Sequence, residues 1–125
     1  MKETIRLSDV ELITKYAIIY ASVNDRPDVV IRCNKHRMQM KQYKEEALLT
    51  EEEILEFSHF CKYAVVSAYG ADFGTQDKIC RIIAKYASHL DQYDCTMIKT
   101  LAKMQRDKEL GKKCPFYKLC RFFAK

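Results

Sequence analysis

Apolar side chains recur every three or four residues along most of this chain, which is the spacing of one face of an α-helix. One stripe continues for five turns through Val29, Cys33, His36, Met40, Tyr43 and Ala47. Only three glycines and two prolines occur in 125 residues, so few positions suit the turns of a sandwich or barrel. The sequence therefore predicts an all-α protein, a single compact bundle of five or six helices with short loops, with residues 1–125 as one domain.

Residues that cap helices mark where several of these helices begin. Ser8 is followed by Glu11, and Thr50 by Glu53, which is the spacing of a capping box. Thr75 is expected to cap the helix that follows Gly74. These positions predict helices beginning near residues 8, 50 and 75.

The stretch 26–48 is open to two interpretations. The five-turn stripe predicts one long helix, with Pro27 in its first turn and Asp25 as its cap. The run Val29-Val30-Ile31 is also typical of a short buried strand, so a strand at 29–33 is the alternative. The length of the stripe favours the helix.

The last residues predict a short C-terminal helix at about 114–124. Cys114 occupies a cap position and Pro115 the first helical position. One face carries the apolar residues Phe116, Leu119, Cys120 and Phe123. Because a helix of about ten residues is marginal alone, we expect it to dock on the bundle.

The six cysteines are expected to be reduced thiols. The chain begins without the apolar stretch of a signal peptide, and no apolar run approaches the ~20 residues of a membrane helix. Three cysteines follow apolar residues, in Phe60-Cys61, Ile79-Cys80 and Leu119-Cys120. These features predict a cytoplasmic protein with reduced cysteines and no membrane association.

A zinc site is the less favoured hypothesis for some of these cysteines. Cys33, His36, Cys114 and Cys120 would form a tetrahedral set of three thiolates and one imidazole. However, Cys33 and His36 lie on the apolar stripe, and six residues of helix turn Cys120 about 120° away from Cys114. We therefore expect ordinary core or surface residues here, and no cofactor.

Charge is concentrated in three segments. Residues 26–44 carry six basic residues and one acidic residue, residues 45–56 carry six glutamates, and residues 98–125 carry nine basic residues and two acidic ones. We interpret the glutamates as solvated helix ends. A basic C-terminal surface consists of Lys99, Lys103, Arg106, Lys112, Lys113, Lys118 and Arg121. A secondary basic face consists of Arg32, Lys35, Lys41 and Lys44.

These patterns predict a binding protein and no catalytic residues. The sequence contains no nucleophile elbow, Walker loop, zincin motif or dinucleotide fingerprint, so a hydrolase or nuclease is disfavoured.

The favoured function is a small non-enzymatic module that binds an acidic protein surface or a nucleoprotein complex through the basic C-terminal surface. An adaptor, or an inhibitor encoded by a phage or mobile element, would act in this way. The alternative is sequence-tolerant binding of RNA or DNA, or a role as a small helical subunit of a nucleoprotein complex. The sequence leaves the partner's identity and the oligomeric state open.

Overall fold

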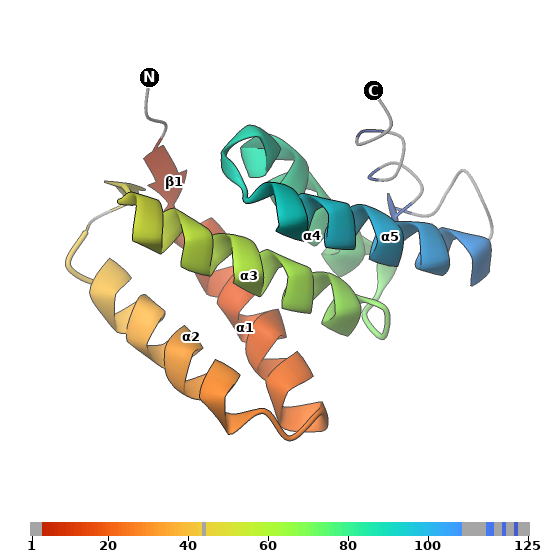
Figure 1. Cartoon of the computed structure of the whole chain (residues 1–125), viewed down its shortest axis with the longest axis horizontal. Coiled ribbons are helices and arrows are strands. Elements are labelled where there is room, and N and C mark those ends of the chain that lie inside the picture. Colours follow the sequence, from red (N-terminus) through yellow and green to blue (C-terminus); the bar gives the residue numbers. More distant parts are fainter. Residues whose placement is uncertain (1–3, 44, 109–114, 117–118, 120–121, 123–125) are drawn as a thin grey trace.

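The computed structural model describes residues 4–43 and 45–108, together with Pro115, Phe116, Leu119 and Phe122. Its elements are β1 (Thr4–Arg6), α1 (Leu7–Val23), α2 (Pro27–Met40), β2 (Glu46–Leu48), α3 (Glu51–Ala68), α4 (Phe73–Tyr86), the 3-10 helix η1 (Ala87–His89) and α5 (Gln92–Lys108) (Figure 1). The predicted all-α bundle is confirmed, because five α-helices of the described chain pack together.

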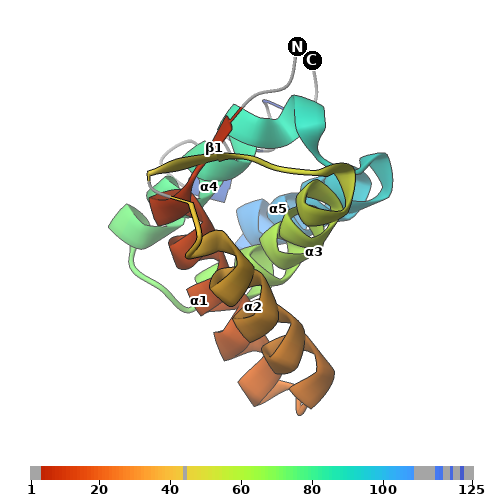
Figure 2. The same cartoon turned by 90° about the vertical axis from the view of Figure 1, so that its left-hand side faces the viewer.

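Helix α3 is the centre of the bundle and contacts α1, α2, α4 and α5. Its interior side chains change along the helix from phenylalanine rings to smaller groups; the fully buried apolar members are Phe57, Phe60, Cys61, Ala64, Val65 and Ala68. Helices α1 and α2 form a hairpin that extends away from α4 and α5 (Figure 2). Helix α2 packs mainly on α1 and less on α3, which leaves its outer side uncovered by the described chain. Within the described ranges, none of the helices has the length and apolar character needed to cross a bilayer.

The single helix predicted for residues 26–48 is wrong beyond residue 40. Helix α2 ends at Met40, and residues 46–48 form β2, which pairs antiparallel with β1. Ile5 lies opposite Ala47 and is buried, so the ribbon covers one end of the core. The alternative of a strand at 29–33 is also wrong, because these residues are helical.

The apolar stripe itself is correct as far as α2 extends. Val29, Cys33, His36 and Met40 are all buried. Pro27 is in the first turn, as predicted, but the cap position is Arg26, without a side-chain cap bond. Asp25 instead has φ 52°, the left-handed conformation that closes the turn between α1 and α2.

The capping box predicted at Ser8 does not form. Helix α1 begins at Leu7, directly after β1, and Arg6 at the cap position makes no side-chain cap bond. The backbone N–H of Leu7 donates instead to the carbonyl of Glu45, at 2.9 Å. Strand pairing therefore sets the start of α1, where the sequence indicated a local cap.

The capping box at Thr50 is confirmed. The Thr50 hydroxyl accepts from the Glu53 N–H at 3.2 Å, and the Glu53 carboxylate accepts from the Thr50 N–H at 3.0 Å. Helix α4 begins earlier than predicted, because Asp72 is its cap and accepts from the N–H of Thr75 at 2.7 Å.

The C-terminal segment docks on the bundle at the residues that the structure describes. Phe116 is fully buried and packs edge to face on Tyr69, with 5.3 Å between ring centroids. Leu119 is also buried, whereas Phe122 is partly exposed. Cys120 and Phe123, the other members of the predicted apolar face, lie outside the described residues.

Candidate functional site

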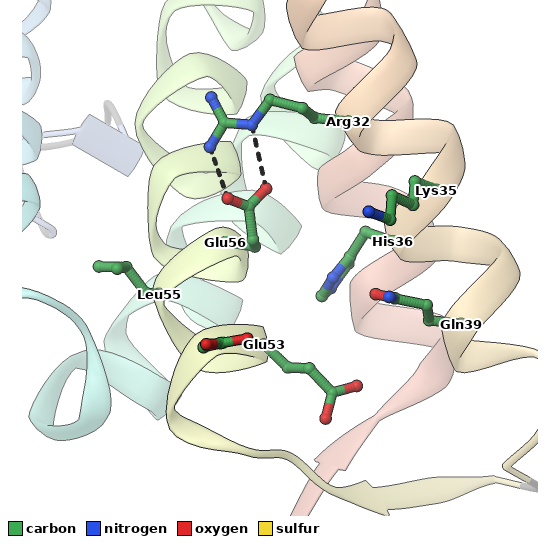
Figure 3. Close-up of a pocket in the computed structure, with 8 residues that line it drawn as sticks. Arg32, Lys35, His36, Gln39, Glu53, Leu55 and Glu56 are labelled. Atoms are coloured by element: carbon green, nitrogen blue, oxygen red, sulfur yellow. Dashed lines mark hydrogen bonds and ion pairs between the residues drawn. The ribbon is translucent and has the colours of Figure 1, made fainter.

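A pocket of about 400 Å³ lies between α2 and the first turns of α3 (Figure 3). Helix α2 and helix α3 contribute four lining residues each: Arg32, Lys35, His36 and Gln39 from the former, and Glu52, Glu53, Leu55 and Glu56 from the latter. The two walls differ in charge because the basic stretch of the sequence forms α2 and the glutamate-rich stretch begins α3. The pocket is therefore asymmetric, with cations on one side and carboxylates on the other.

Arg32 and Glu56 neutralise each other across one end of this pocket. Arg32 Nη2 lies 2.6 Å from Glu56 Oε1, and Arg32 Nε donates to Glu56 Oε2 at 3.2 Å. Two parallel bonds of this kind fix the relative position of the two helices as well as joining two charges. This pair is the only ion pair between α2 and α3 among the described residues.

His36 is the most unusual residue of the lining. Its side chain is 2% exposed, and neither ring nitrogen has a hydrogen-bond partner in the part of the chain that the structure describes. The ring lies between α2 and α3, directed toward α3, and it packs edge to face on Phe60 at 5.4 Å (Figure 3). Burial lowers the pKa of His36, while the Glu56 and Glu53 carboxylates act in the opposite direction. The imidazole is therefore neutral near pH 7, with one donor and one acceptor unused.

Some of the other polar lining residues already have hydrogen-bond or ion-pair partners, and others do not. Glu53 holds the Thr50 N–H in the capping box, and Glu56 is bound by Arg32. Lys35, Gln39 and Glu52 are exposed and make no side-chain hydrogen bond or ion pair within the described ranges. The pocket thus offers an unsatisfied imidazole in its interior, together with an ammonium, an amide and a carboxylate that remain available to a ligand.

A second polar cluster joins α3 to α5, and the sequence reasoning missed it. The buried Asp94 carboxylate accepts from the Ser58 hydroxyl at 2.9 Å and from the Lys62 ammonium at 3.2 Å. His59 Nδ1 lies 2.7 Å from Asp94 Oδ2, close enough for an ion pair but outside hydrogen-bond geometry. Ser58 also accepts from the Asp91 N–H at 3.0 Å. Because Ser58 and Asp94 are fully buried, this cluster is a structural link between helices.

One signal could have revealed this cluster. Ser58 lies four residues after Ile54 and next to Phe57, so it is a polar residue on an apolar helix face. A polar group on such a face needs a hydrogen-bond partner. Nothing in the spacing identifies Asp94 as that partner.

The basic C-terminal surface is described at two of its residues. Lys99 and Lys103 are exposed on α5, one helical turn apart, and neither pairs with a carboxylate of the described chain. Arg106 lies in α5, but its side chain is not among those that the structure describes. The remaining members, Lys112, Lys113, Lys118 and Arg121, also lie outside the described residues.

The structure describes three residues of the secondary basic face, and two of them, Arg32 and Lys35, line the same pocket. Arg32 is bound to Glu56, whereas Lys35 is exposed beside the pocket. Lys41 is exposed beyond the end of α2, near Arg6 and Glu11. Lys44 lies outside the described residues.

Two of the four residues in the zinc hypothesis are described by the structure, and two are not. Cys33 and His36 are buried on α2, while Cys114 and Cys120 lie outside the described residues. Burial raises the pKa of the Cys33 thiol to about 12, which opposes the thiolate form that zinc requires. In the described ranges, no group of three His, Cys, Asp or Glu side chains is placed to hold a metal.

The buried cysteines behave as small apolar residues. Burial raises the pKa of both the Cys61 and the Cys95 thiol. Cys33, Cys61 and Cys95 are free thiols inside the core. The prediction of reduced cysteines is correct for these three.

Comparisons with protein-family models, with curated proteins and with solved structures gave no significant match to this chain.

Proposed function

We propose that this chain is a small, non-enzymatic helical module that binds an acidic protein surface through the basic C-terminal surface. The observation that supports this function is the pair Lys99 and Lys103, which share one exposed face of α5 and have no carboxylate partner in the described chain. Lys62, by contrast, is engaged within the fold by Asp94. The α5 lysines are thus available to a partner. An adaptor, or an inhibitor carried by a phage or mobile element, would use such a surface.

Electrostatic docking of this kind gives the partner both its orientation and its rate of association. Cations at the rim of an interface contribute chiefly to the association rate and to salt dependence, while adding little to the stability of the free protein. Lys99 and Lys103 should therefore be replaceable without loss of fold.

The experiment is affinity capture from lysate with immobilised wild-type protein and two charge variants. Lys99→Ser/Lys103→Ser removes the α5 pair, and Lys15→Ser/Lys78→Ser is the matched control, because these two lysines are exposed on α1 and α4. After nuclease treatment, the partner should be retained by the wild type and the control and lost with the α5 variant. A partner retained equally by all three proteins would contradict the proposal.

Nucleic-acid binding is the second candidate, and the same α5 pair supports it because phosphates are also anionic. A salt series with polyuridylate and duplex DNA separates the two functions. Direct phosphate contact gives an affinity that falls with log salt at a slope near −0.7 to −0.9 per phosphate neutralised. Binding that shows this slope and survives in the Lys15/Lys78 control would favour nucleic acid over a protein partner.

A further inference from the structure

We propose that the pocket between α2 and α3 is a binding site for an arginine side chain carried by a protein segment. The site concerns α2 and α3, so the inference goes beyond the function proposed for α5. Its starting point is His36, a residue that is 2% exposed, lines the pocket and has no partner for either ring nitrogen among the described residues. A buried polar group in this condition costs free energy that a ligand can recover by completing its hydrogen bonds.

The charges of the lining favour a cationic ligand. Arg32 and Glu56 cancel each other, which leaves Lys35 against Glu52 and Glu53. The α3 wall belongs to residues 45–56, which contain six glutamates and no basic residue, while the α2 wall belongs to the basic stretch 26–44. A neutral imidazole presents one acceptor nitrogen, so it can take an N–H from an incoming cation. The unpaired Glu52 carboxylate on the α3 wall and the acceptor nitrogen of His36 are therefore suited to a donor-rich cation.

The hydrogen-bonding groups of the lining favour a guanidinium over an ammonium. Guanidinium carries five N–H donors in a planar fork, which can bind a carboxylate with two parallel bonds and still donate to a third group. Glu52 is the carboxylate with no other partner in the described chain, and His36 is the third group. Guanidinium is also less strongly hydrated than ammonium, so it enters a partly enclosed pocket at lower cost. Leu55, which is partly exposed, lines the same pocket and can cover the methylene groups.

The surface beside the pocket indicates that the arginine belongs to a protein segment. Lys35 and Gln39 line both this pocket and a shallow hollow on the outer side of α2. That hollow also contains Ile31 and Met38, two large apolar side chains that are 67% and 71% exposed. An occupant that covers them must extend beyond one side chain and carry apolar residues. A peptide with an arginine and a nearby leucine meets both requirements, whereas a polyamine does not.

The first test uses two peptides and the whole protein. The probes are acetyl-Leu-Ala-Ala-Arg-amide and the same peptide with citrulline, which keeps the shape of arginine but removes its charge. Binding is followed by calorimetry, and the His36 ring nitrogens are followed by NMR. We expect the arginine peptide to bind about tenfold more tightly and to shift the His36 nitrogen resonances, because a charge-assisted bond contributes about 1.4 kcal/mol or more. Equal affinity for both peptides, or unchanged His36 resonances, would overturn the proposal.

The second test separates the pocket from the general negative charge of α3. Glu52→Gln and Glu51→Gln remove the same charge from adjacent exposed positions in the first turn of α3, but only Glu52 lines the pocket. The arginine peptide should lose about tenfold in affinity with Glu52→Gln and less than about twofold with Glu51→Gln. Equal losses would mean that only the diffuse field attracts the peptide. Spermidine that binds as tightly as the arginine peptide would rule out the protein segment as occupant.

Discussion

The Asp94 carboxylate of α5 lies 3.2 Å from the Lys62 ammonium of α3, and the Asp94 side chain is completely buried. The Ser58 hydroxyl donates a hydrogen bond to the other carboxylate oxygen of Asp94. A charge held in the interior in this way depends on its partners, because an unpaired buried ion is far less stable than one in water. Asp94 therefore couples the packing of α5 to Ser58 and Lys62 of α3, with His59 beside them.

Replacing Asp94 should strongly destabilise the fold. Asp94→Asn removes the buried charge that Lys62 needs, so we expect the free energy of unfolding to fall by about 3–5 kcal/mol in urea denaturation. Asp77→Asn is the matched control, because Asp77 pairs with the exposed Arg81 on the surface of α4. That change should cost less than about 0.5 kcal/mol. Similar losses for both variants would show that Asp94 is not an essential partner of Lys62.

The two sequence-predicted capping boxes should respond differently to alanine. Thr50→Ala removes a hydroxyl that accepts from the Glu53 N–H, and it should destabilise the protein by about 1 kcal/mol. Ser8→Ala should leave the melting temperature unchanged, because α1 is not capped by a side chain. Thermal unfolding by circular dichroism measures both. A loss with Ser8→Ala equal to that with Thr50→Ala would place the start of α1 at Ser8.

His36 should make the stability of the protein depend on pH. Burial lowers its pKa in the folded state, so the unfolded chain binds the proton more readily. Stability from this group is therefore present above the unfolded pKa of about 6.5 and is lost as the pH falls toward the folded value. His36→Phe keeps a ring against Phe60 and removes the titration.

The comparison is the melting temperature of both proteins between pH 7.5 and pH 5. As the pH falls over this interval, the melting temperature of the wild type should decrease more than that of His36→Phe, because only the wild type has the buried imidazole. Parallel curves for the two proteins would show that His36 is protonated equally well in the folded and unfolded states.

Phe116 should contribute more to stability than an exposed phenylalanine. Phe116→Ala removes a fully buried ring that packs on Tyr69, so a loss of about 3–5 kcal/mol is expected. Phe73→Ala is the matched control, since Phe73 is half exposed at the start of α4. In urea denaturation, Phe73→Ala should lower the free energy of unfolding by less than half as much as Phe116→Ala. A small effect at Phe116 would mean that the C-terminal segment adds little to the core.

The helices could be predicted from the sequence because each carries its own pattern. The stripe from Val29 to Met40 and the box at Thr50 are local, and both agree with the structure. The β ribbon could not be predicted in the same way, because strands of three residues are too short to show alternation. Ile5 is buried by pairing with a segment more than forty residues away, and no local signal reports that contact.

The candidate sites also differ in whether a local pattern or a contact between distant segments forms them. Lys99 and Lys103 could be placed on one face because they are one turn apart in the same helix. Their role in binding stays a prediction. The pocket at His36 depends on Glu52 and Glu53 of another helix, and on the angle at which α2 meets α3. Helix packing determines that angle, and the sequence pattern of either helix alone does not.

The central position of α3 has a consequence for the protein during its synthesis. Helix α1 packs chiefly on α3, so its buried residues Ile13 and Ala17 gain their main cover only after residue 68 has been made. At about 5–20 residues per second, α1 is complete several seconds before its partner. Throughout that interval, the emerging α1–α2 hairpin exposes an apolar face to the ribosome surface and to chaperones. The N-terminal third of the chain is therefore the part that waits longest for its main packing partner during synthesis.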